Sequence, residues 1–187
     1  MRIIAGDAHG RRLRAPRGLS TRPATARVRA SIFSRLASRM EFTDARVLDL
    51  FAGSGSLGIE ALSRGARSAV FVDSSRAAAA VIRDNLRVLK LAERAEVIVA
   101  GVERALAQLG TRGDRFDLVF VDAPYRHDIS AAVLAELEAR QLVEKGGWVM
   151  VRQEARTARL TPATLEEASC ATLGGHRLTL YHAATVR

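Results

Sequence analysis

Residues 46–58, Arg-Val-Leu-Asp-Leu-Phe-Ala-Gly-Ser-Gly-Ser-Leu-Gly, decide the fold of this chain. The first six form a short apolar run that predicts a buried strand, and the next seven carry three glycines that predict a tight turn. A helix is expected to begin near Ile59 and to end at Gly65. Residues 68–73, Ser-Ala-Val-Phe-Val-Asp, predict a second strand that closes on an acid. The unit is strand, turn, helix and strand, as in an α/β protein.

The turn and the acids around it are suited to holding a ligand. Gly53 and Gly55 allow the backbone to lie against a ligand with no Cβ in the way, and Asp73 can accept hydrogen bonds from a ribose diol. This glycine spacing alone favours a dinucleotide. Asp49 favours S-adenosylmethionine over NAD, because a carboxylate repels a pyrophosphate and attracts an ammonium and a sulfonium. A tight turn without a ligand is the alternative.

Strands and helices alternate along the rest of the chain. Further helices are predicted at 24–39, 76–91, 101–109 and 129–140, and further strands at 95–100, 115–122, 147–152, 167–173 and 177–186. The last two strands flank a glycine pair and predict an antiparallel hairpin. The alternation predicts a mostly parallel seven-stranded sheet with helices on both faces.

Composition indicates one globular domain with a small basic extension. The chain has 187 residues, 48% of them hydrophobic, and the extension is expected at 1–22 with the main domain at 23–187. A net charge of +9 favours a polyanionic partner, although a genome that uses arginine freely would give the same charge. The single cysteine excludes an internal disulfide. Without a long apolar segment, no membrane association is expected, and the location is expected to be cytoplasmic.

Positive charge is densest near the start of the chain. Residues 2–5 and 11–14 are expected to pair as a hairpin, followed by the helix at 24–39. Between Arg2 and Arg39 there are ten arginines and one acid, which predicts contacts with nucleic-acid phosphates. A solvated basic face with no partner is the alternative. The candidate phosphate contacts are Arg2, Arg11, Arg12, Arg14, Arg22, Arg27 and Arg29, with the last two expected away from the apolar face of the helix.

Residues 122–125, Asp-Ala-Pro-Tyr, form the second informative motif. Because the carboxyl ends of parallel strands share one edge of a sheet, this turn is expected to face the glycine turn. Asp122 and the Ala123 carbonyl can accept hydrogen bonds from an amine, and Tyr125 offers a face for stacking a base. The motif predicts that an exocyclic base amine is held against a methyl donor, with positioning supplying much of the rate. A simple turn after a strand is the alternative.

Together these motifs resemble those of the RsmD family. The resemblance is carried by residues 49–58, 122–125, 2–6, 10–13, 22–29 and 32–33. It implies a Rossmann-like class I methyltransferase fold, S-adenosyl-L-methionine as methyl donor, and methylation of the N2 amine of guanine at position 966 in 16S rRNA. It also implies binding of 16S rRNA or of a particle in small-subunit assembly, and a monomer is the default expectation.

The resemblance also assigns roles to residues where the motifs match. It implies a target-base pocket at Asp122, Ala123, Pro124 and Tyr125, and cofactor contacts at Asp49, Phe51, Ala52, Gly53, Ser54, Gly55, Asp73, Ser74, Gly101 and Val102. Ala123 departs from the family pattern, where a proline is usual, and Ala26 and Ala30 stand where acids are usual. The four histidines show no spacing that predicts a metal site.

Two other functions are compatible with the same residues. The turn at 122–125 could hold adenine N6 or cytosine N4 of DNA, although no separate target-recognition domain is evident. Alternatively, the chain could be a non-catalytic RNA-binding protein of ribosome assembly that retains the cofactor fold, which Ala123 favours.

Overall fold

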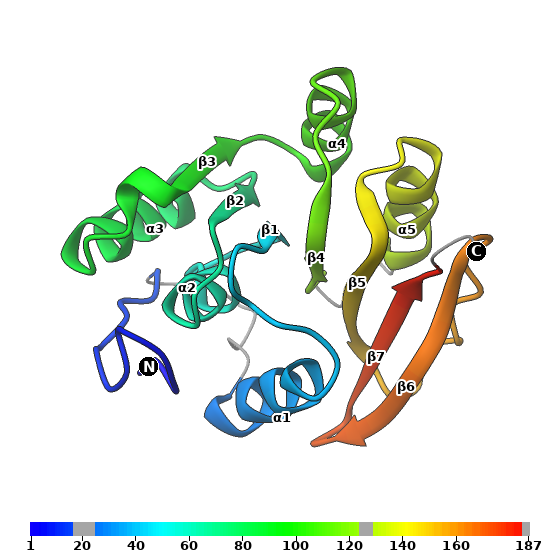
Figure 1. Cartoon of the computed structure of the whole chain (residues 1–187), viewed down its shortest axis with the longest axis horizontal. Helices are drawn as coiled ribbons and strands as arrows, with labels where there is room; N and C mark the ends of the chain where they lie inside the picture. The colour runs from blue at the N-terminus through cyan, green and yellow to red at the C-terminus, as the bar shows by residue number, and fades with distance from the viewer. Residues whose placement is uncertain (17–24, 124–128, 185–187) are drawn as a thin grey trace.

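A twisted sheet runs through the middle of the molecule in this computed structural model (Figure 1). The structure describes residues 1–16, 25–123 and 129–184. Within them the sheet has seven strands in the order β3-β2-β1-β4-β5-β7-β6. The strands are β1 Arg46–Leu50, β2 Ser68–Asp73, β3 Ala95–Val99, β4 Phe116–Val121, β5 Val143–Glu154, β6 Leu165–Leu173 and β7 His176–Ala183. The first five are parallel, and β7 runs antiparallel to both β5 and β6, which confirms the predicted sheet.

Helices cover both faces of this sheet (Figure 1). The helices are α1 Ala26–Ala37, α2 Ser56–Ser63, α3 Arg76–Val88, α4 Val102–Thr111 and α5 Ser130–Ala139, with a short 3-10 turn at Ala92–Arg94. Apolar residues of α1, α2 and α3 share one core with one face of the sheet, and those of α4 and α5 share a second core with the other. The fold therefore has three layers, with the N-terminal segment packed on the α1–α3 side.

Short polar signals set where several helices begin. The Ser75 hydroxyl accepts a hydrogen bond from the Ala78 amide at the start of α3, and Thr25 does the same for Val28 at the start of α1. The α2 helix begins at Ser56, three residues before the predicted start, because Gly55 adopts a left-handed conformation directly before it.

Other boundaries also differ from the sequence prediction. Helix α3 ends at Val88 instead of residue 91, because Lys90 has a φ of 60°. Strand β5 is longer at both ends than the predicted 147–152, and its pairing with β7 extends to Glu154. The last strand was predicted to extend to residue 186, and among the described residues it ends at Ala183.

The N-terminal segment forms the expected hairpin in a minimal form. It has one antiparallel bridge, Arg2 with Arg12, supported by bonds from the Ile3 amide to the Arg11 carbonyl and from the Gly10 amide to the Ile3 carbonyl. Ile3 and Leu13 are buried in the α1–α3 core, so the segment is attached to the main body by its apolar side chains. Arg2, Arg11, Arg12 and Arg14 are exposed, and the first two also donate to the backbone carbonyls of Gly10 and Val88.

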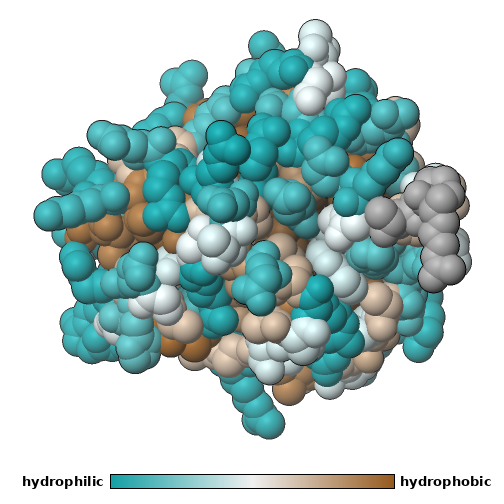
Figure 2. Space-filling view, viewed as in Figure 1, coloured by the Kyte–Doolittle hydropathy of each residue, from teal (hydrophilic) through white to brown (hydrophobic). Residues whose placement is uncertain are grey.

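Most of the face seen in Figure 2 is hydrophilic, with small hydrophobic areas between the charged side chains. In the described part of the chain, no helix has the length and apolar character needed to cross a membrane.

Candidate cofactor and base-binding site

The candidate site lies where the strand order reverses. Strand β1 pairs with β2 on one side and with β4 on the other, and Leu50 lies beside both Val72 and Val121. The segments that follow these strands therefore emerge side by side at the carboxyl edge of the sheet. In open α/β sheets this reversal point is the usual place for a ligand. The structure brings the glycine turn, Asp73 and Asp122 to this one edge, as the sequence predicted.

The glycine turn has a backbone conformation that favours glycine at two positions. Gly53 and Gly55 have φ angles of 56° and 74°, and the Gly55 amide donates to the Ala52 carbonyl at 2.7 Å. A Cβ on Gly55 would lie 3.2 Å from Ile82 and 3.3 Å from Ile59, in addition to the strain of its positive φ. Phe51 also has a positive φ, 59°, which is rare for a non-glycine residue and marks the point where the strand turns sharply.

Asp73 connects the turn to the next helix. Its Oδ2 accepts a hydrogen bond from the Gly53 amide at 2.8 Å, and its Oδ1 accepts one from the Ser75 amide at 2.8 Å. A carboxylate oxygen can accept more than one hydrogen bond, so these contacts leave acceptor capacity for a diol. The neighbouring Ser74 is exposed. The structure therefore fixes the Asp73 carboxylate at the rim of the turn.

Asp49 lies beneath the turn and is only 1% exposed. Its Oδ2 accepts the Gly58 amide at 2.9 Å, inside helix α2. Gly58 is required there because a Cβ would lie 2.4 Å from the Phe71 ring. Burial raises the pKa of Asp49 well above its ordinary value, against the Gly58 hydrogen bond, and the nearby charges of Asp122 and Asp73 raise it further. A buried carboxylate with acidic neighbours favours a cation at this edge.

Asp122 forms an ion pair that the sequence analysis missed. Arg152, on the adjacent strand β5, donates from Nε to Oδ1 at 2.5 Å and from Nη2 to Oδ2 at 3.0 Å. The two side chains are 7% and 15% exposed, Arg152 and Asp122 respectively, so the pair is largely desolvated. Val151 of β5 lies beside Val121 of β4, and this register, which the sequence does not show, places the two following residues together. Arg152 fixes the plane of the Asp122 carboxylate.

For the remaining candidate residues that it describes, the structure gives position and burial, but no contact that points to a role. Ala123 is buried next to Asp122, while Pro124 and Tyr125 lie outside the described residues. Gly101 is exposed and precedes helix α4, whose first residue Val102 is buried. Ala52 and Ser54 are both buried in the glycine turn. Among the described residues no cluster of histidine, cysteine and acidic side chains could hold a metal ion.

One candidate RNA contact is wrong. Arg29 is 1% exposed, and its Nη2 donates to the Arg2 carbonyl at 2.6 Å. It lies three and four residues before Ile32 and Phe33, so the helical period places it on their buried face. Burial lowers the pKa of Arg29, while the charge of Glu60 raises it. Arg27 is exposed, and Arg22 lies outside the described residues.

Known proteins with similar sequences include one protein family and relatives described as rRNA methyltransferases. Residues 1–182 match the family described as Conserved hypothetical protein 95. The chain is 40% identical to the Ribosomal RNA small subunit methyltransferase D of Escherichia coli K12 over 149 residues, 80% of this chain and 69% of that protein. It is 40% identical over 154 residues to a Bacillus subtilis protein provisionally described as the rRNA methyltransferase YlbH, covering 82% and 83% of the two chains.

A solved structure extends this similarity to the whole chain. An Escherichia coli protein provisionally described as the methyltransferase yhhF superposes with a TM-score of 0.84 at 33% identity. The match covers 100% of this chain and 99% of that one, so it includes the N-terminal segment and the C-terminal hairpin as well as the sheet.

Proposed function

Because the chain belongs to the RsmD family, we propose that it is an S-adenosylmethionine-dependent methyltransferase that modifies the N2 amine of a guanine in 16S rRNA. The observation that carries this proposal is the grouping of Asp49, Asp73 and Asp122 beside the glycine turn at one edge of the sheet. A cationic methyl donor and a base amine would meet at this edge.

The residues of the turn fit the proposed cofactor. The buried Asp49 would attract its ammonium and sulfonium, Asp73 would accept hydrogen bonds from its ribose, and Gly53 and Gly55 would let the backbone lie against it. Ala52, Ser54, Ser74, Gly101 and Val102 are the remaining candidate contacts, with Phe51 at the start of the turn. Bound there, S-adenosylmethionine would supply a methyl group, whose carbon the amine nitrogen would attack while the sulfur leaves as the thioether of S-adenosylhomocysteine.

The geometry of Asp122 favours guanine as the target. A carboxylate only accepts hydrogen bonds, and Arg152 holds both of its oxygens in a fixed plane. Guanine presents two donors side by side, N1–H and the N2 amine, whereas adenine and cytosine present a ring acceptor beside the exocyclic amine. Asp122 would therefore accept from the guanine edge and orient the N2 lone pair, with the Ala123 carbonyl as a second acceptor. After the transfer the cationic nitrogen would lose a proton to solvent.

The basic segment would hold the RNA. Arg2, Arg11, Arg12, Arg14 and Arg27 are exposed on the hairpin and at the start of α1, so they are available for phosphates. The proposed target is guanine 966, within 16S rRNA or a particle in small-subunit assembly. Pro124 and Tyr125 would complete the base pocket, Arg22 would add a phosphate contact, and the protein would act as a cytoplasmic monomer.

The test is transfer from labelled S-adenosylmethionine to small-subunit particles that lack the modification. We expect label in 16S rRNA and N2-methylguanine by mass spectrometry of the digested RNA. Asp122→Asn should lower kcat by about 10²-fold or more, because it replaces one of the two acceptor oxygens with a donor and removes the charge that pairs with Arg152. Label in duplex DNA alone would instead identify a DNA amino-methyltransferase. Particle binding without transfer would indicate a non-catalytic assembly protein.

A further inference from the structure

Asn85, on helix α3, joins two parts of the molecule that the proposed function separates. Its side chain is 4% exposed, and each of its polar atoms is bonded. Nδ2 donates to the Ser54 carbonyl in the glycine turn at 3.1 Å and to the Arg14 carbonyl at 3.0 Å. Oδ1 accepts from the Arg14 amide at 2.9 Å. One buried amide therefore holds both the glycine turn and the end of the basic hairpin.

The same hairpin is attached at a second place, which does not touch the turn. The Glu60 carboxylate of α2 accepts the amides of Ile4 and Ala5 at 2.8 and 3.0 Å. The Ser63 hydroxyl donates to the Ala5 carbonyl and accepts from the Ala8 amide. These groups hold residues 4–8 against the outer part of α2. Asn85 is bonded both to the hairpin and to the Ser54 carbonyl of the glycine turn, and the Ser54 hydroxyl also donates to the Met1 sulfur at 3.8 Å.

We propose that Asn85 is a positioning residue that couples RNA binding at the hairpin to cofactor binding at the glycine turn. The inference rests on the proposed function, because it requires both ligands. RNA phosphates that clamp Arg11, Arg12 and Arg14 hold the Arg14 backbone against Asn85. That contact in turn fixes the Ser54 carbonyl and the turn around it. When RNA binds the hairpin first, the cofactor then binds a glycine turn that is already ordered, and the reverse holds when the cofactor binds first.

Thermodynamic linkage requires that RNA and cofactor affect each other's binding equally. If RNA tightens cofactor binding, the cofactor must tighten RNA binding by the same factor. We expect a factor of about ten, within the range usual for such coupling. Removing a contact that merely stabilises the fold would lower the affinity for both ligands, but it would leave the effect of each ligand on the other's affinity unchanged. The ratio of affinities is therefore the quantity that distinguishes a positioning residue from a structural one.

The experiment measures the Kd of tritium-labelled S-adenosylhomocysteine for the full chain, with and without saturating unmodified small-subunit particles. No transfer occurs with this compound, so binding alone is recorded. Wild-type protein should bind it about tenfold more tightly with particles present. Asn85→Ala should reduce this ratio to within about twofold of unity. Ser63→Ala is the matched control: it removes a buried hairpin contact far from the turn, and it should keep the wild-type ratio.

The possible results separate the coupling proposal from the methyltransferase proposal. A wild-type ratio near one, or an unchanged ratio in Asn85→Ala, would overturn the coupling while leaving the methyltransferase proposal intact. Failure of the wild-type protein to bind either ligand would overturn the proposed function itself, and the coupling with it. If Asn85→Ala does not fold, amide exchange in the wild-type protein decides. Particles alone must slow exchange at Gly55 and Ser56, and unaltered exchange there would refute the inference.

Discussion

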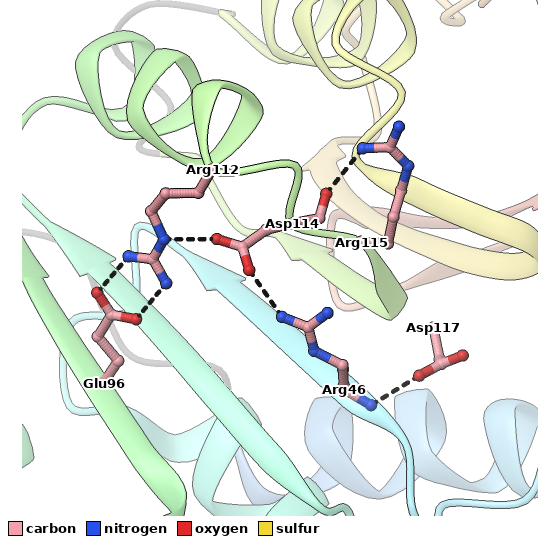
Figure 3. Close-up of polar contacts among 6 residues, drawn as sticks. All are labelled: Arg46, Glu96, Arg112, Asp114, Arg115 and Asp117. Carbon is pink, nitrogen blue, oxygen red and sulfur yellow. Dashed lines mark hydrogen bonds and ion pairs between the residues drawn. The ribbon is translucent and has the colours of Figure 1, made fainter.

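The two edges of the sheet use acidic side chains in opposite ways. At the amino edge, Arg112 pairs with Glu96 through two bonds of 2.7 and 2.9 Å and also contacts Asp114 (Figure 3). Arg46 bonds Asp114 at 2.8 Å through its side chain, and its amide donates to Asp117. The Glu96 hydrogen bond raises the pKa of Arg112 above its ordinary value. Positive and negative charges at this edge are closely matched.

At the carboxyl edge the acids are not matched in this way. Asp49 and Asp73 accept backbone amides, and neither has an ion pair among the described residues. Only Asp122 is paired there, with Arg152. Backbone amides fix these two side chains in place without supplying a positive charge beside them. Charges at the amino edge are therefore paired within the protein, while Asp49 and Asp73 at the carboxyl edge have no ion-pair partner among the described residues, which fits the proposed cationic ligand.

The largest effect is expected from Arg152→Met, which removes the cation that pairs with Asp122 at the carboxyl edge. Breaking a buried pair leaves Asp122 desolvated and should lower the free energy of unfolding by about 3 kcal/mol. The loss of carboxylate orientation should lower kcat about 10²-fold, with a smaller change in the KM for RNA particles. Denaturant unfolding and initial rates measure the two effects.

Arg152→Lys is the matched control, because it keeps the charge and loses the two-bond geometry. It should recover most of the stability and little of the rate. Full recovery of kcat by lysine would show that charge alone, and not orientation, is what Arg152 supplies.

The next effect concerns the raised pKa of Asp49. Between the ordinary carboxyl pKa and its higher folded value, the folded state holds the proton more tightly than the unfolded chain. Stability should therefore fall as pH rises through this window, and the cost is fully present above the folded pKa. Asn cannot ionise, so Asp49→Asn should melt at a higher temperature than wild type, and the gap should widen as pH rises.

At a pH between the ordinary carboxyl pKa and the raised pKa of Asp49, the same residue should release a proton when the cation binds. Calorimetry of S-adenosylmethionine binding in buffers of different ionisation enthalpy measures that release. In Asp49→Asn the proton release should disappear, and the affinity for S-adenosylmethionine should fall about tenfold (1.4 kcal/mol). Equal proton release by the variant and the wild type would assign the effect to another group and remove Asp49 from the cofactor site.

The smallest effect is expected at the amino edge. Arg112→Ala removes the partner of Glu96 where both side chains are about 40% exposed. Such pairs contribute at most about 1 kcal/mol, and the contribution is screened by salt. We expect a small loss of stability at low ionic strength, measured by denaturant unfolding, with kcat and cofactor affinity as in wild type. A loss of transfer comparable to that of Arg152→Met would erase the distinction between the two edges.

The sequence predicted the features that follow from short-range chemistry. The glycine turn, the seven strands and the shared edge of the two motifs depend on strand–turn–helix signals and on the pairing rules of parallel sheets. It could not predict the contacts that depend on register and long-range packing. Arg152 meets Asp122 across thirty positions, and Asn85 meets Arg14 across seventy-one. Arg29 was misplaced although its spacing from Phe33 was visible, because arginine is so seldom buried.

The most direct test follows backbone amide signals by NMR while S-adenosylhomocysteine is added to the protein. Gly53, Gly55, Gly58 and Ser75, which adjoin the carboxyl-edge acids, should show the largest shifts. Arg46, Glu96 and Arg112 at the opposite edge should stay nearly unchanged. Shifts centred on the amino edge, or spread equally over both, would contradict the assignment of cofactor binding to the carboxyl edge.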